Sequence, residues 1–112
     1  MAVAKKEFDK NSKGEQAYFY EITNAAGMKA VVTDFGATLH SLYVPDKDGN
    51  FRDVVWGYDS VAEYEFDNGP YFGGTIGRIA NRVGGSKVTI NGVEYQMETN
   101  ERTNCLHSGP NC

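Results

Sequence analysis

The chain has 112 residues, 40% of them hydrophobic and 23% charged, which is typical of one globular domain and not of a disordered segment. Its net charge of −4 provides no basic field that would attract nucleic acid or an anionic membrane surface. No apolar run approaches the ~18 residues that a membrane-spanning helix needs. We therefore expect neither nucleic acid nor a membrane as a partner.

The residue types favour strands over helices. The sequence holds ten Val, four Ile, seven Thr, seven Tyr and six Phe, but only three Leu. The first five types fit a pleated, half-buried surface, whereas Leu is the usual residue of helical bundles. Thirteen Gly and three Pro supply turns. Composition alone predicts an all-β protein.

The N-terminus and the cysteines favour a cytoplasmic protein. Residues 1–8 contain no apolar stretch of the kind found in secretory signals. The two cysteines, Cys105 and Cys112, are fewer than a small secreted domain would carry. We expect both to be reduced thiols, with a disulfide between them as the less favoured alternative.

Strand patterns separated by turns begin the chain. Residues 18–23, 28–33 and 37–44 read as three strands, the first two joined by turn residues 24–27. A fourth, short strand is predicted at 54–56, after the turn at 45–50.

A short helix and a hairpin follow. Ser60 and Glu63 have the spacing of a capping box, so one helix is predicted near 60–66. Strands at 87–90 and 93–97 flank Asn91-Gly92, the strongest short signal for a two-residue β-hairpin. Short strands at this spacing predict a sandwich or a barrel.

The Gly-rich segment 71–85 is the first candidate for function. It fits neither of the glycine patterns that cradle nucleotide phosphates. It does concentrate Arg78, Asn81 and Arg82, whose donors and acceptors suit the vicinal hydroxyls of a sugar. The alternative, favoured on the local pattern alone, is an arginine tied to a carboxylate of the fold plus an asparagine turn.

His107 is the second candidate, because it lies in a polar, turn-rich stretch and can exchange a proton near neutral pH. A plain surface histidine is the alternative. His40 lies within a strand pattern and is expected to be structural. Two histidines and two cysteines are too dispersed for a convincing zinc site, so no metal is expected.

The motifs together resemble the aldose 1-epimerase (galactose mutarotase) family. The pattern Gly-Arg-x-Ala-Asn-Arg at 77–82 is followed about twenty residues later by Asn-x-Leu-His-x-Gly at 104–109. The pair of motifs is highly specific. Further landmarks occur in the same order as in the family: Asp34-Phe35-Gly36-Ala37, Val44-Pro45-Asp46, the segment 53–58, Tyr64, Tyr71-Phe72-Gly73 and Asn100.

This resemblance implies an antiparallel β-sandwich of the galactose mutarotase type, of which residues 1–112 would be the N-terminal part. It implies an isomerase of hexose metabolism that interconverts the α and β anomers of galactose and glucose without metal or cofactor. Asn81 and Arg82 would bind the sugar, and His107 would bind it and take part in catalysis. Arg78 would be structural support.

The resemblance also implies catalytic groups that this chain lacks. The family's second histidine and its glutamate base would lie beyond residue 112, so the expectation is a truncated form with an incomplete site. Ser108 replaces a glycine that is common in the family, which narrows the backbone freedom of the loop. A non-catalytic carbohydrate-binding or interaction module is the alternative function. Uncovered sheet edges would favour self-association.

Overall fold

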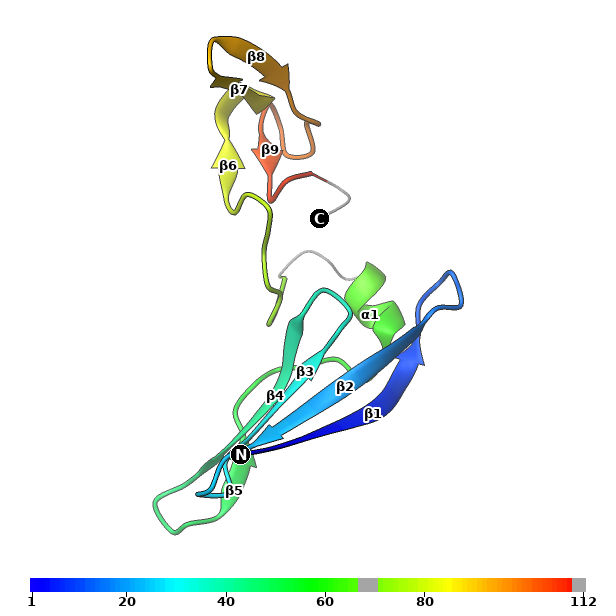
Figure 1. Cartoon of the computed structure of the whole chain (residues 1–112), viewed down its shortest axis with the longest axis vertical. Helices are drawn as coiled ribbons and strands as arrows, with labels where there is room; N and C mark the ends of the chain where they lie inside the picture. Colours follow the sequence, from blue (N-terminus) through cyan, green and yellow to red (C-terminus); the bar gives the residue numbers. More distant parts are fainter. Residues whose placement is uncertain (67–70, 110–112) are drawn as a thin grey trace. The chain divides into compact units, whose positions relative to one another are not determined.

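The computed structural model describes residues 1–66 and 71–109, and it confirms an all-β chain with antiparallel strands and one short α-helix (Figure 1). The chain divides into two compact units, Met1–Thr75 and Ile76–Cys112. Within the described ranges, no helix is long and apolar enough to span a bilayer.

The first unit is a five-stranded antiparallel sheet in which neighbours in sequence are neighbours in space (Figure 1). Its strands are β1 (Ala2–Lys10), β2 (Gln16–Thr23), β3 (Lys29–Thr33), β4 (Thr38–Pro45) and β5 (Phe51–Asp53). The predicted strands at 18–23, 28–33 and 37–44 are confirmed as β2, β3 and β4. Strand β1 was not predicted, because seven of its nine side chains are exposed, five are polar, and they give no apolar alternation.

The prediction of a strand at 54–56 is wrong, because β5 ends at Asp53. The Asp53 carboxylate accepts hydrogen bonds from the backbone N–H of Leu42 at 2.9 Å and of Val55 at 3.1 Å. A side chain therefore takes the place of the next ladder bond, and the strand stops where the apolar run begins.

The helix α1 (Val61–Phe66) starts at the predicted capping box. The Glu63 N–H donates to the Ser60 hydroxyl at 3.2 Å, and the Glu63 carboxylate accepts from the Ser60 N–H at 3.1 Å. Val61 is fully buried, and its N–H donates to the Asp9 carboxylate at 3.1 Å. These contacts hold α1 against β1 (Figure 1).

His40 has the structural role that its strand position predicts. Its ring lies 4.5 Å from the Phe19 ring and 5.7 Å from the Phe8 ring, and its Nδ1 lies 3.1 Å from the Tyr64 hydroxyl. The Tyr64 oxygen also accepts the Tyr58 N–H at 3.0 Å. Burial lowers the pKa of His40 below its ordinary value of 6.5 and raises the pKa of Tyr64, so both groups are held neutral.

The second unit contains β6 (Arg82–Val83), the 3-10 turn Gly84–Ser86, β7 (Lys87–Ile90), β8 (Val93–Gln96) and β9 (Cys105–Leu106). Strands β7 and β8 form the predicted hairpin, and Asn91 and Gly92 have the positive φ angles of 51° and 79° that their turn requires. Cys105 is a fully buried free thiol. Cys112 lies outside the described residues, so the expectation that it is a reduced thiol stays a prediction.

Candidate functional site

The pairing of β6 with β9 brings the two sequence motifs together. Arg82 lies opposite Leu106 and Val83 opposite Cys105 in an antiparallel register. Asn81 and His107 are the next residues at the open end of this two-rung ladder. Three of the predicted site residues, Asn81, Arg82 and His107, therefore lie on two adjacent backbone segments although 25 positions separate Arg82 from His107.

Asn81 and His107 continue the ladder through two hydrogen bonds. The His107 N–H donates to the Asn81 carbonyl at 3.0 Å. The Asn81 N–H donates to Nδ1 of the His107 ring at 3.1 Å. Because Nδ1 accepts this bond, the neutral ring carries its proton on Nε2. The backbone thus orients the His107 imidazole and fixes it as an Nε2–H donor.

Arg82 forms an ion pair with a carboxylate of the fold, as the structural alternative for this arginine-rich segment predicts. Its Nε donates to Glu101 at 3.1 Å, and the Asn104 amide donates to the same carboxylate oxygen at 3.1 Å. The hydrogen bonds from Arg82 and Asn104 hold the pKa of the Glu101 carboxyl below its ordinary value. Half of the Arg82 side chain, 52%, is still exposed, so the structural ion pair does not exclude a ligand contact.

Glu101 is a residue that the sequence interpretation missed. Its local signal was weak, because one acid in a polar, turn-rich stretch reads as a solvated turn residue. The structure shows that Glu101 is not a simple solvated turn residue. Its backbone N–H donates to the Asn104 carbonyl at 3.1 Å, and the Asn104 N–H donates back to the Glu101 carbonyl at 2.8 Å. This tight loop presents the carboxylate to Arg82.

Asn100 fixes the strand that precedes His107. Its side-chain oxygen accepts the Leu106 N–H at 2.7 Å, and its side-chain nitrogen donates to the Leu106 carbonyl at 2.9 Å. The amide group of Asn100 therefore serves Leu106 as a neighbouring strand would. This contact explains physically why an asparagine suits this position.

Arg78 is exposed, and within the part of the chain that the structure describes its guanidinium forms no ion pair. The role of structural support that the motif implies for Arg78 therefore stays a prediction.

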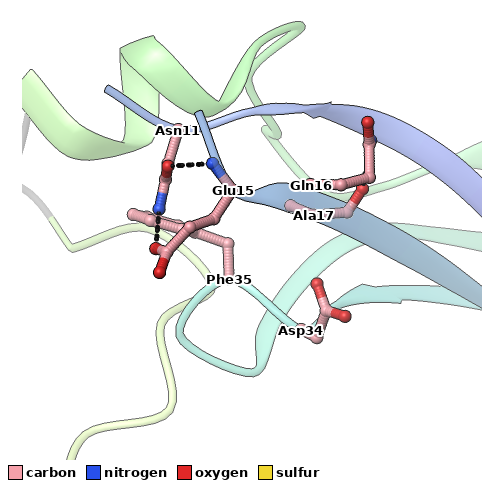
Figure 2. Close-up of a pocket in the computed structure, with 6 residues that line it drawn as sticks. All are labelled: Asn11, Glu15, Gln16, Ala17, Asp34 and Phe35. Carbon is pink, nitrogen blue, oxygen red and sulfur yellow. Dashed lines mark hydrogen bonds between the residues drawn. The ribbon is translucent and has the colours of Figure 1, made fainter. Parts of the chain in front are cut away.

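The first unit has a hollow of its own, of about 240 Å³, which contains none of the predicted site residues (Figure 2). Figure 2 shows Asn11 closing one side of the hollow through two hydrogen bonds to Glu15. The Asn11 side-chain nitrogen donates to the Glu15 carboxylate at 2.6 Å, and the Glu15 backbone N–H donates to the Asn11 side-chain oxygen at 2.8 Å. The hollow is open and lined by both polar and apolar groups, and the Asp34 carboxylate in its lining already accepts the Tyr18 N–H at 2.8 Å. In residues 1–66 and 71–109, no three His, Cys, Asp or Glu side chains gather as metal ligands.

The sequence matches known proteins over most of its length. The aldose 1-epimerase family profile matches residues 18–111. The chain is 37% identical to the galactose mutarotase of Bos taurus over 82 residues, which are 73% of this chain and 24% of that protein. It is 35% identical to the aldose 1-epimerase of Escherichia coli K12 over 97 residues, 87% of this chain and 28% of that protein. The chain thus spans about a quarter of the length of these curated relatives.

The fold matches solved structures of the same family. A crystal structure of a GalM/aldose epimerase homologue from C. elegans superposes with a TM-score of 0.77 at 41% identity, covering 85% of this chain and 29% of that one. The galactose 1-epimerase of Lactobacillus acidophilus superposes with a TM-score of 0.76 at 25% identity, covering 97% and 31%. The β-rich architecture, the two motifs that β6 and β9 bring together and these matches lead to one conclusion: the chain belongs to the aldose 1-epimerase family.

Proposed function

We propose that Asn81, Arg82 and His107 form the hexose-binding part of an aldose 1-epimerase site, and that galactose and glucose are its ligands. The observation that carries this proposal is the hydrogen-bonded pair of Asn81 and His107 beside the half-exposed Arg82. A sugar offers hydroxyl groups that both donate and accept. An asparagine amide, a guanidinium fork and an oriented Nε2–H donor match that pattern.

The proposed reaction sets the role of each group. Mutarotation needs an acid that protonates the ring oxygen and a base that takes the proton of the anomeric hydroxyl. The neutral His107 ring donates a hydrogen bond from Nε2–H to the ring oxygen and keeps its proton, and Asn81 and Arg82 hold the ring hydroxyls. Because a hydrogen-bond donor supplies neither the acid nor the base, we expect the 112 residues alone to bind sugar more readily than they convert it.

We further propose that residues 1–112 form the N-terminal part of a single β-sandwich domain of this family. The similarity to the solved structures, which extends over most of this chain, supports this assignment. Family membership also favours a site in an isomerase over the alternative of an unrelated carbohydrate-binding module.

Titration calorimetry with galactose tests the binding proposal, with Arg82→Gln as the variant and Arg102→Gln as its matched control. Arg102 is 86% exposed in the same unit and lies 3.8 Å from the same Glu101 carboxylate, so both variants remove one cation near it. We expect R82Q to weaken binding about tenfold, because a hydrogen bond from a charged donor is lost, and R102Q to bind as the parent does.

Polarimetry of freshly dissolved α-D-galactose tests the chemistry. The expected result for the 112 residues is a rate equal to the buffer blank. Acceleration that disappears in His107→Gln would show that these residues suffice for turnover. Absence of galactose and glucose binding in the parent chain would contradict the proposed function.

A further inference from the structure

Ser108 has a backbone conformation that residues with a side chain rarely adopt. Its φ is +68°, next to His107 at +53° and close to Asn81 at +63° across the ladder. A Cβ atom makes this left-handed region unfavourable, and a serine there needs a compensating contact.

The Ser108 hydroxyl supplies that contact by binding both backbone groups of Ile79. It accepts the Ile79 N–H at 2.7 Å and lies 3.1 Å from the Ile79 carbonyl, to which it donates. A single hydroxyl has one donor and two acceptor sites, so both bonds form at once. The Ser108 hydroxyl therefore satisfies both backbone groups of Ile79, as a paired strand would, beyond the end of the β6–β9 ladder.

The segment 76–81 depends on this contact. For the residues that the structure describes, the hydrogen bonds of 76–81 all go to His107 or Ser108. The segment has no strand of its own, since β6 begins at Arg82. Asn81 is thus held on one side by β6 and on the other by the attachment of Ile79, two residues earlier, to Ser108.

We propose that Ser108 is a positioning residue of the sugar site, whose hydroxyl holds segment 79–81 so that the Asn81 side chain faces the sugar beside His107. This inference rests on the proposed function, because it assigns Ser108 a purpose in hexose binding. It goes beyond that function, because Ser108 acts through the backbone of Ile79 and does not need to contact the sugar itself.

Two substitutions separate this role from that of an ordinary turn residue. Ser108→Ala removes the hydroxyl and keeps the unfavourable φ, whereas Ser108→Gly removes the hydroxyl and relieves the φ. A turn residue without a positioning role would lose stability as alanine and gain it as glycine. If Ser108 is a positioning residue, the backbone at Ile79 and Asn81 becomes less ordered in both variants. Asn91→Gly is the control, since it also relieves a positive φ of 51° but lies in the β7–β8 turn.

The experiment is amide hydrogen exchange read by NMR on the full chain, followed by galactose titration of the same samples. We expect the Ile79 and Asn81 amides to exchange about tenfold faster in S108A and S108G, and galactose to bind several-fold to tenfold more weakly in both, as the loss of one or two hydrogen bonds predicts. N91G should leave both readouts unchanged.

Unchanged exchange at Ile79 and Asn81 in both variants would overturn the proposal, and so would faster exchange with galactose affinity equal to that of the parent. If the parent binds no galactose, the proposed function fails and the purpose assigned to Ser108 fails with it. The exchange rates then decide separately whether the hydroxyl holds segment 79–81.

Discussion

Glu101 determines how the Arg82 guanidinium is presented, because the carboxylate holds one edge of the guanidinium and leaves the rest of the side chain half exposed. The hydrogen bond from Asn104 fixes the carboxylate in turn. At the scale of single residues, the proposed site therefore combines the groups assigned to the sugar with a second set that orients them.

Glu101→Gln tests this arrangement, since glutamine keeps the shape of glutamate and loses its charge. We expect galactose to bind E101Q more weakly than the parent, because the Arg82 side chain then adopts more orientations. Glu94→Gln is the matched control, an acid of the same unit that pairs with Lys87 at 2.8 Å. Equal galactose affinities of E101Q and the parent would show that Arg82 needs no carboxylate to orient it.

His40 gives the first unit a defined pH dependence. Because burial lowers the pKa of His40 in the folded chain, the unfolded chain binds the proton more readily. The stability that His40 contributes is therefore fully present above pH 6.5. It is lost as the pH falls from 6.5 through the lower pKa of the folded chain. Asp53 and Asp59 oppose the shift, and Phe8, Phe19 and Tyr64 enclose the ring.

An NMR titration of the His40 ring protons measures this effect directly. We expect a midpoint below 6.5. In urea unfolding, the free energy of unfolding should fall between pH 7 and pH 5, and His40→Gln should remove this fall. The carboxyl groups of Glu21, Asp46, Asp53 and Glu101 have pKa values lowered from 4.5 or 3.8, so most of the stability they contribute is lost below this interval. A His40 midpoint above 6.5 would contradict the account.

At the scale of elements, the Asn100 amide stabilises β9 by binding both backbone groups of Leu106. Asn100→Ala removes both hydrogen bonds to Leu106 and should lower the free energy of unfolding of the second unit by about 1 kcal/mol, because the bonds lie near the surface. Asn100→Asp keeps the acceptor for the Leu106 N–H and should lose less. The exchange rate of the Leu106 amide reports the change, and equal rates in the parent and N100A would disprove the role of Asn100.

Local sequence predicted the elements whose signals are local. The capping box at Ser60, the Asn91-Gly92 turn and the alternating strands β2 to β4 depend on residues a few positions apart. Strand β1 escaped prediction because an exposed edge strand carries lysines in place of an apolar alternation. Strands β6 and β9 escaped because two-residue strands form only by pairing with each other across the chain.

The candidate site shows the same division. Asn81, Arg82 and His107 were predicted from motifs, which composition and periodicity would not have supplied. Glu101 and the Ser108–Ile79 contact were missed, because each depends on a distant partner that only the β6–β9 register reveals.

At the scale of the whole molecule, the described residues include more exposed large apolar side chains than buried apolar side chains. The described residues bury Ala17, Val31, Val61 and Cys105, whereas thirteen large hydrophobic residues are exposed. Trp56 is 78% exposed and stacks on Phe72, with 6.1 Å between ring centroids. Exposed apolar surface of this extent favours association.

We therefore predict that the 112-residue chain self-associates as its concentration rises. Sedimentation velocity over a concentration series measures this, and Trp56→Ser should shift the equilibrium toward the monomer. Strands β1 and β5 are the edges of the five-stranded sheet and provide a further route for pairing between copies. A monomer at every concentration would contradict this prediction.

Asn81, Arg82 and His107 are proposed to bind a hexose. An NMR titration of the chain with galactose tests this proposal most directly, because each backbone amide reports on its own surroundings. We expect chemical-shift changes concentrated at Asn81, Arg82 and His107, with the β7–β8 hairpin unaffected and the changes lost in R82Q. Absence of shift changes at these three residues, or changes confined to the first unit, would contradict the proposal.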